Sequence, residues 1–157
     1  MHNYWDIRFF GFGFSPLVND YKIVTIGMIE QDAKVNSLSK RSWEELDYVI
    51  ARVGHMIQPI VIVNGTVFWL GWGNIGHGYI VISFDIAMEE FSLISIPLPS
   101  SISCLELKLI VYENKLALFR TPNMRSNIGS PFIDLWVMDQ ESSSPSGNSW
   151  WGTWTKK

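Results

Sequence analysis

Residues 59–72 read PIVIVNGTVFWLGW, and this stretch decides the fold class. Two runs of β-branched and aromatic residues, which favour strands, flank the pair Asn64-Gly65. Asn and Gly tolerate the positive φ angles of a two-residue hairpin turn of the primed type, so the stretch predicts an antiparallel hairpin. Residues 107–119, LKLIVYENKLALF, predict a second hairpin that turns at Glu113-Asn114.

The same order of elements follows each hairpin. Further strands are predicted at 79–85 and 91–96, and again at 133–139 and 150–155. Asn64 and Asn114 lie 50 residues apart, and a repeat near that length is typical of kelch-type propeller blades. The first third fits less well, with strands expected at 9–14, 20–28 and 34–38 and a fourth that Trp43 opens.

The repeat predicts an all-β, kelch-like partial β-propeller of about three four-stranded antiparallel blades. The units fall near residues 8–50, 58–97 and 104–156. Inner strands of stacked blades are apolar on both faces, as the runs PIVIV, YIVISF and IDLWVM are. A large aromatic on each last strand (Trp43, Phe91, and Trp150 or Trp154) is expected to cover the next blade.

A helix at residues 42–53, SWEELDYVIARV, is a minor alternative to the fourth strand, because a Ser followed by Glu residues is typical of a helix start. Residues 140–148, QESSSPSGN, are rich in Ser, Pro and Gly and predict an exposed loop.

Composition excludes several classes of protein. The chain has 157 residues, is 47% hydrophobic and carries a formal net charge of −3, which argues against disorder and against nucleic acid as a partner. The apolar stretch at 57–72 is interrupted by polar residues, so no membrane span is expected. Cys104 is the single cysteine, which precludes an intramolecular disulfide and suits the cytosol or nucleus.

No pattern predicts catalysis, a cofactor or a metal. Residues 71–76 match GxGxxG, but a strand follows instead of the helix that would hold a phosphate, so we expect a loop. His2, His55 and His77 lack a metal-ligand spacing, and Cys104 is expected to be an inert thiol. An enzyme such as a propeller hydrolase would need a polar cluster facing a central channel, and none is evident.

Seven short motifs, in order, resemble those of the plant F-box-associated interaction domain. GFGFSP at 11–16 and NDYKIV at 19–24 resemble its opening. The others are VNSL with SW (35–38, 42–43), VNG with FWL (63–65, 68–70), ISFD with EEF (82–85, 89–91), PLP (97–99), and LWVM with TWTK (135–138, 153–156). Ser15, Asn36 and Phe68 stand where the family usually has Asp, Tyr and His. S-locus F-box proteins of pollen carry a similar domain.

The resemblance implies a non-catalytic module that binds the target protein of a Skp–cullin–F-box ubiquitin ligase. No F-box is recognised here, so a Skp adaptor is expected as a partner only if an F-box lies elsewhere in the natural chain. Family members usually continue past the last motif, which predicts that residues 1–157 form a single, truncated domain. Three blades would not close a propeller, and exposed apolar surface is expected.

In a propeller the loops that join the second and third strands line one face, and we expect the target to bind there. The candidate residues are Gln31, Asp32, Trp72, Asn74, His77, Asn123 and Arg125. Trp72 and Arg125 are favoured because Trp and Arg are frequent interface anchors; Trp43 and Trp69 are expected mainly to pack in the blades. Two alternatives stay open, a non-functional fragment of a longer gene product and a domain that stacks sugars on its Trp-lined loops.

Overall fold

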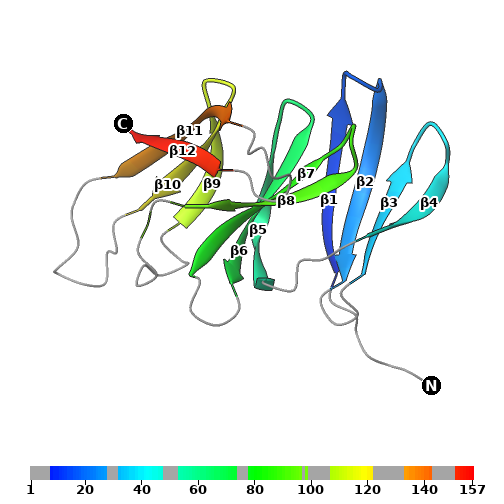
Figure 1. Ribbon diagram of the computed structural model, residues 1–157, viewed down its shortest axis with the longest axis horizontal. Helices are drawn as coiled ribbons and strands as arrows, with labels where there is room; N and C mark the ends of the chain where they lie inside the picture. Colours follow the sequence, from blue (N-terminus) through cyan, green and yellow to red (C-terminus); the bar gives the residue numbers. More distant parts are fainter. Residues whose placement is uncertain are drawn as a thin grey trace.

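The computed structural model describes residues 8–27, 32–47, 53–73, 78–96, 98, 107–121, 133–142 and 151–157, and in these ranges it contains strands and turns only. Twelve strands form three four-stranded antiparallel sheets (Figure 1). The sheets are called blades 1, 2 and 3 in chain order. This architecture confirms the predicted all-β, partial-propeller fold.

Blade 1 contains β1 (Arg8–Ser15), β2 (Asp20–Gly27), β3 (Ala33–Ser37) and β4 (Ser42–Leu46). Blade 2 contains β5 (Val53–Val63), β6 (Thr66–Gly73), β7 (Tyr79–Asp85) and β8 (Glu90–Ser95). Blade 3 contains β9 (Leu107–Tyr112), β10 (Lys115–Arg120), β11 (Asp134–Ser142) and β12 (Trp151–Lys156). Each sheet keeps its strands in chain order, so every strand pairs with the one before and after it.

The helix considered at residues 42–53 is wrong. Ser42–Leu46 is strand β4, and β5 begins at Val53. Trp43, Glu44 and Glu45 pair across to β3, at Asn36, Val35 and Lys34. Strand pairing with β3 therefore overrides the weak helix-start signal, as tertiary context commonly does for short segments.

Tight turns join the strands at one end of the blades. Asn64 and Gly65 have φ of 48° and 75°, and Glu113 and Asn114 have φ of 47° and 60°, so the two predicted hairpin turns are confirmed. In Figure 1 these turns lie at the top, as does the β1–β2 turn. The second strand of each blade ends, and the third begins, at the opposite end of the blade.

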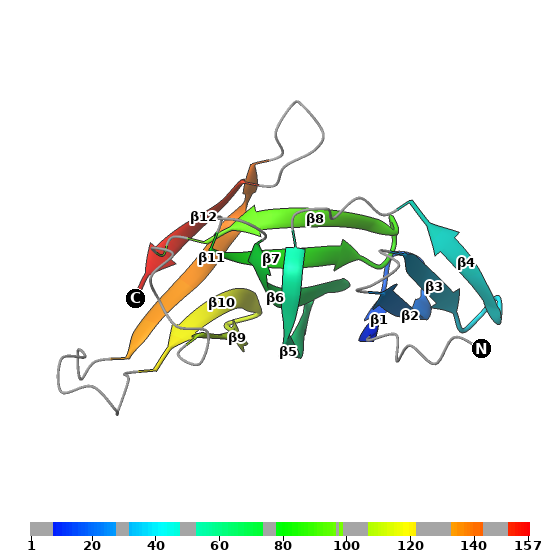
Figure 2. The same cartoon turned by 90° about the horizontal axis from the view of Figure 1, so that it is seen from below.

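Figure 2 shows the blades side by side in an arc, with the first strands β1, β5 and β9 on one side and the last strands β4, β8 and β12 on the other. Blade 2 lies between its neighbours. Strand β6 shows how it serves both, because alternate side chains of a strand point to opposite faces. Val67 and Trp69 face blade 1, whereas Phe68 and Leu70 face blade 3.

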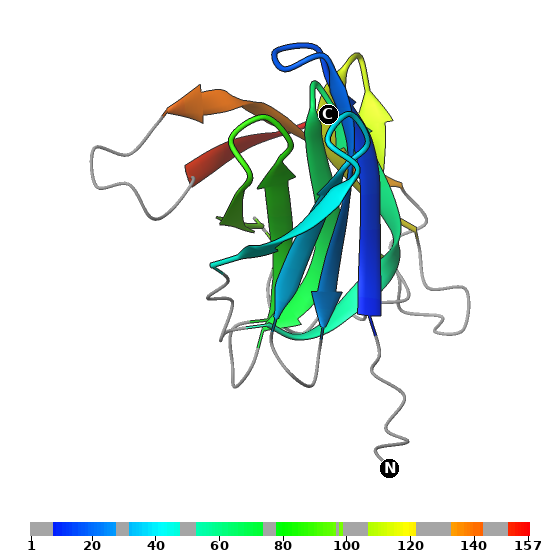
Figure 3. The same ribbon diagram turned by 90° about the vertical axis from the view of Figure 1, so that its right-hand side faces the viewer.

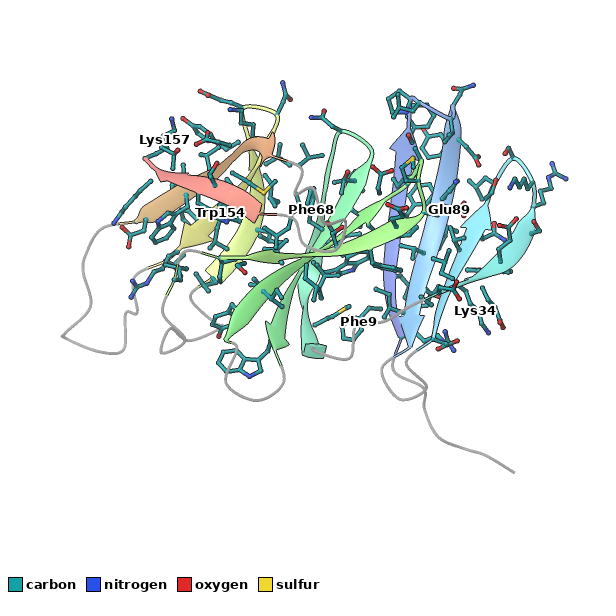
Figure 4. The ribbon with its side chains drawn as sticks, in the orientation of Figure 1. Phe9, Lys34, Phe68, Glu89, Trp154 and Lys157 are labelled. Atoms are coloured by element: carbon teal, nitrogen blue, oxygen red, sulfur yellow. The ribbon has the colours of Figure 1, made fainter. Side chains whose placement is uncertain are left out.

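Two hydrophobic cores result, one at each junction between blades. The core between blades 1 and 2 includes Phe9, Val24, Ile26, Val35, Met56, Val67, Trp69, Ile82, Phe84 and Ile86. The core between blades 2 and 3 includes Val61, Phe68, Leu70, Tyr79, Val81, Ile94, Leu107, Leu109, Leu116, Leu118 and Trp136. Figure 4 shows Phe9 pointing from β1 toward blade 2.

Two tryptophans also join neighbouring blades by hydrogen bonds. Trp69 Nε1 donates to the carbonyl of Phe10 in blade 1 at 3.3 Å. Trp154 Nε1 donates to the carbonyl of Ser95 in blade 2 at 2.9 Å (Figure 4). Trp154 thus covers the preceding blade and not the next one, and Phe91 likewise packs toward blade 1. As predicted, Phe91 and Trp154 each cover a neighbouring blade, but it is the preceding blade and not the next one.

Candidate recognition surface

The predicted recognition surface lies at the end of the blades opposite the tight turns. Strands β2 and β6 end there at Gly27 and Gly73, and β3 and β7 begin there at Ala33 and Tyr79. The antiparallel order places the end of β10 and the start of β11 at the same end of blade 3 (Figure 1). In each blade the end of the second strand and the start of the third therefore lie side by side, opposite the tight turns.

Asp32 and Trp72 are the two candidate residues that the structure describes. The other five, Gln31, Asn74, His77, Asn123 and Arg125, lie outside the described residues. They remain predictions, and so does the expected inertness of Cys104.

Trp72 is the next-to-last residue of β6 and its side chain is 39% exposed. Its register partner on β7 is Tyr79, and their ring centroids lie 4.7 Å apart at an interplanar angle of 84°. This edge-to-face arrangement is favourable for aromatic rings. Tyr79 is only 6% exposed and belongs to the core between blades 2 and 3. Trp72 is therefore a partly exposed indole fixed to a buried partner, which is a suitable anchor for a bound protein.

Asp32 has a structural role in blade 1. Its backbone carbonyl accepts a hydrogen bond from the Gly27 amide at 2.8 Å, which closes the end of β2 against the start of β3. Arg8 Nη2 donates to its carboxylate at 3.1 and 3.3 Å, and Lys34 Nζ lies 3.6 Å from the same group. Arg8 and Lys34 of two different strands therefore both pair with the Asp32 carboxylate.

Arg8 and Lys34 were missed as members of this end of the molecule. Their place follows from the strand register, in which Arg8 pairs with Gly27 and Lys34 with Thr25. Register is hard to read from sequence, because a one-residue slip moves every side chain to the other face.

The other two tryptophans separate into different environments. Trp69 is fully buried, as expected for blade packing, whereas Trp43 is 53% exposed and lies outside both cores. Blade packing of Trp43 against this chain is therefore not observed.

The part of the chain that the structure describes contains no group of three or more His, Cys, Asp or Glu side chains that could hold a metal ion. It also contains no helix long and apolar enough to cross a membrane. What this surface presents is an aromatic ring and paired charges on a rigid sheet, which suits binding by packing and charge complementarity.

Stacked four-stranded antiparallel sheets of this kind define a β-propeller class of domain. The family model described as the F-box associated beta propeller domain matches residues 2–150 of the chain. The chain belongs to this family, and the resemblance carried by the seven motifs is confirmed.

Three relatives from Arabidopsis thaliana carry the name F-box protein. One is 26% identical over 99% of this chain and 39% of its own length. A second is 29% identical over 92% of this chain and 33% of its own length. A third is 25% identical over 82% of this chain and 41% of its own length. The chain thus spans about two fifths or less of these relatives. No solved structure matches the chain significantly.

Proposed function

We propose that this domain binds the target protein of an F-box-type ubiquitin ligase and has no catalytic activity of its own. The observation that carries the proposal is the fixed, partly exposed Trp72 at the end of a blade, in a chain of the F-box associated beta propeller family. Relatives named as F-box proteins support the ligase context. A Skp adaptor would be a partner only through an F-box elsewhere in the natural chain.

The proposed binding face is the end of the blades that carries Trp72 and the ion pairs around Asp32. A partly exposed indole gains most when a partner desolvates it, and interface hot spots are enriched in Trp and Arg. The charges of Arg8, Asp32 and Lys34 would orient the partner without supplying most of the affinity. The partner class is therefore a folded protein or peptide that presents an apolar residue to Trp72.

Quantitative affinity capture from the source tissue tests the proposal. The bait is the wild-type chain beside a Trp72→Ala variant, and we expect a discrete set of proteins that the variant loses at least tenfold. Met88→Ala is the matched control, since Met88 is 66% exposed on the turn at the opposite end of blade 2. That variant should recover the same proteins as wild type.

Equal recovery by wild type and by Trp72→Ala would contradict the proposed face. Recovery of chaperones alone by every bait would instead support the alternative of a non-functional fragment. A sugar-binding role predicts a positive glycan array that Trp72→Ala abolishes. We further propose a cytosolic or nuclear location, which imaging of a fluorescent fusion in the source cells would test.

A further inference from the structure

Charged side chains of blade 3 lie on the opposite side of the junction from Trp72. Trp72 lies near the end of β6 and Tyr79 begins β7, and the strand register pairs them. Arg120 and Asp134 hold the corresponding positions in blade 3, at the end of β10 and the start of β11, and they also pair. Neighbouring blades therefore carry an aromatic pair and a charged pair at equivalent places.

The two pairs point into the same junction, because paired residues and residues two apart on a strand share a face. Tyr79 belongs to the core between blades 2 and 3, so its partner Trp72 faces blade 3. Trp136 belongs to the same core, so Asp134, two residues earlier, and its partner Arg120 face blade 2. Strand β9 of blade 3 contacts β5 and β6 of blade 2, as Figure 2 shows.

Lys156 of β12 is the most exposed charge of this group. Its Nζ lies 2.8 Å from Oδ1 of Asp134 and 5.3 Å from the centroid of the Trp136 ring. Its side chain is 60% exposed, against 33% for Arg120 and 17% for Asp134. Figure 3 shows the last strands, β4, β8 and β12, to one side of the first strands. Two neighbours thus hold a solvent-exposed ammonium on the last strand of blade 3.

The ammonium of Lys156 can bind a second carboxylate. A lysine ammonium has three N–H donors, so a bond to Asp134 leaves donors for another acceptor. Asp134 is also shared with Arg120, whose Nη1 lies 3.8 Å from Oδ2. Because Asp134 and Trp136 already restrict Lys156, binding would cost less side-chain entropy than it would for an unrestrained lysine.

The sequence between these strands favours an anionic partner as well. Residues 121–133, TPNMRSNIGSPFI, join β10 to β11 and contain Arg125 and no Asp or Glu. Charges on the two sides of an interface are arranged with complementary sign, which steers the right partner and disfavours the wrong one. The charge in this part of the chain is therefore complementary to a carboxylate.

We propose that Lys156 binds an acidic side chain of the protein whose apolar residue packs on Trp72. The inference rests on the proposed function and adds a charge requirement to it, an Asp or Glu near the apolar residue of the partner. A standard interface buries about 800 Å² on each partner, a patch roughly 30 Å across. Packed sheets lie about 10 Å apart, so such a patch covers both sides of the junction.

Selection from a random twelve-residue peptide library displayed on phage tests the proposal. The baits are the wild-type chain and Trp72→Ala. Peptides that wild type retains and Trp72→Ala loses are those that depend on the exposed indole. We expect these peptides to be enriched at least threefold in Asp and Glu over the unselected library, and to be depleted in Lys and Arg.

An exchange of charge between the chain and the peptide assigns the preference to Lys156. The probes are one selected peptide and a version with its acidic residue replaced by Lys, measured by fluorescence anisotropy. Wild type should bind the acidic peptide at least tenfold more tightly. Lys156→Glu should reverse this preference, and Lys156→Gln, which places no carboxylate beside Asp134, should abolish it. Far-ultraviolet circular dichroism and thermal unfolding check that both variants fold.

Lys40→Glu is the matched control for the change in net charge. Lys40 is 63% exposed and its Nζ lies 3.4 Å from Oε1 of Glu44, on the turn between β3 and β4 of blade 1. The substitution alters the charge of the chain as much as Lys156→Glu does. It should leave the ratio of the two dissociation constants unchanged.

Three results would overturn the inference. Trp72-dependent peptides without an excess of acidic residues would remove the charge requirement and leave the proposed function standing. An equal loss of preference in Lys40→Glu would show that net charge, and not this site, selects the peptide. A library in which no peptide depends on Trp72 would overturn the proposed binding face and this inference together.

Discussion

Gly11 provides the room for the largest buried side chain at the junction between blades 1 and 2. A Cβ atom at this position would stand 2.5 Å from Cζ2 of Trp69 and 2.8 Å from Cγ1 of Val67. Trp69 is fully buried and its indole nitrogen is already engaged with Phe10. The ring therefore has no free direction in which to move.

We expect Gly11→Ala to lower the free energy of unfolding by about 1–3 kcal/mol, the usual cost of overpacking a core. Gly13→Ala is the matched control. Its Cβ would meet Cδ1 of Ile86 at 2.6 Å, and that atom ends a flexible side chain that can rotate away. Urea unfolding measures how much unfolding free energy each variant loses. Equal losses in Gly11→Ala and Gly13→Ala would contradict the expectation that Trp69, unlike Ile86, cannot move away from the added Cβ atom.

Asp20, the first residue of β2, stabilises the turn between β3 and β4 by hydrogen bonds. Ser37 Oγ donates to its Oδ2 at 2.5 Å, and the Ser39 amide donates to Oδ1 at 3.1 Å. The hydrogen bond from Ser37 is the main cause that lowers the pKa of Asp20 below 3.8, against the opposing effect of burial. The folded state therefore favours the ionised carboxylate.

This lowered pKa makes part of the stability depend on pH. The contribution is complete above pH 3.8, the reference value, and is lost as the pH falls through the lower pKa of the folded state. Asp20→Asn should be less stable than wild type at pH 7, and the difference should shrink below pH 3.8. Chemical unfolding of both proteins from pH 7 to pH 3 measures this difference in stability. If the difference stays constant over that range, the ionised Asp20 carboxylate does not contribute to the pH dependence of stability.

At the scale of the elements, the two hairpin turns differ in how well their residues suit positive φ angles. Asn64-Gly65 has the residue types that a primed turn prefers, whereas the second hairpin places Glu113 at a φ of 47°. A left-handed conformation costs most residues about 1–2 kcal/mol, and Asn and Gly less. The β9–β10 turn is therefore a weak point of blade 3.

Replacing this turn should stabilise the protein. We expect Glu113→Asn combined with Asn114→Gly to raise the free energy of unfolding by about 1 kcal/mol, because both residues then suit positive φ. The reverse exchange, Asn64→Glu with Gly65→Asn, should destabilise by at least as much, since φ is 48° at Asn64 and 75° at Gly65 and the new residues suit these values less well. Thermal unfolding of the two variants should give midpoint shifts of opposite sign.

The elements were more predictable from sequence than the surfaces that they form. Hairpins at Asn64-Gly65 and Glu113-Asn114 follow from local turn chemistry, and their strands follow from residue type. The direction in which Trp43, Phe91 and Trp154 point depends on how the blades stack, which is a long-range property. For the same reason sequence reasoning could propose Trp72 as a candidate but missed the ion pairs that Arg8 and Lys34 make with Asp32.

At the scale of the whole molecule, stability depends on the junctions between blades. A four-stranded sheet with one buried face has little core of its own, so each blade relies on its neighbour. Among the described residues, blade 2 has a core on both faces, whereas blades 1 and 3 have one such junction each. An ion pair crosses the first junction, between Lys22 Nζ of β2 and Glu89 Oε1 on the β7–β8 turn, at 2.6 Å.

This ion pair should couple blade 1 to blade 2. Lys22 is only 8% exposed and Glu89 23%, so removal of the carboxylate leaves a buried charge without its partner in this pair. We expect Glu89→Gln to destabilise by about 1–3 kcal/mol and to do so nearly equally in low and high salt, because a buried pair is weakly screened. Gln keeps the length of the side chain at a position whose φ is 58°, which isolates the effect of charge.

A double-mutant cycle with Lys22→Met separates coupling from local damage. The Met side chain fills the space of the lysine stem without a charge, so Glu89→Gln should cost much less in the Lys22→Met background than in wild type. A coupling energy of about 0.5–3 kcal/mol is the expected range for residues in contact. A cycle that closes to zero would show that the two charges are independent, and that apolar packing alone holds blade 1 against blade 2.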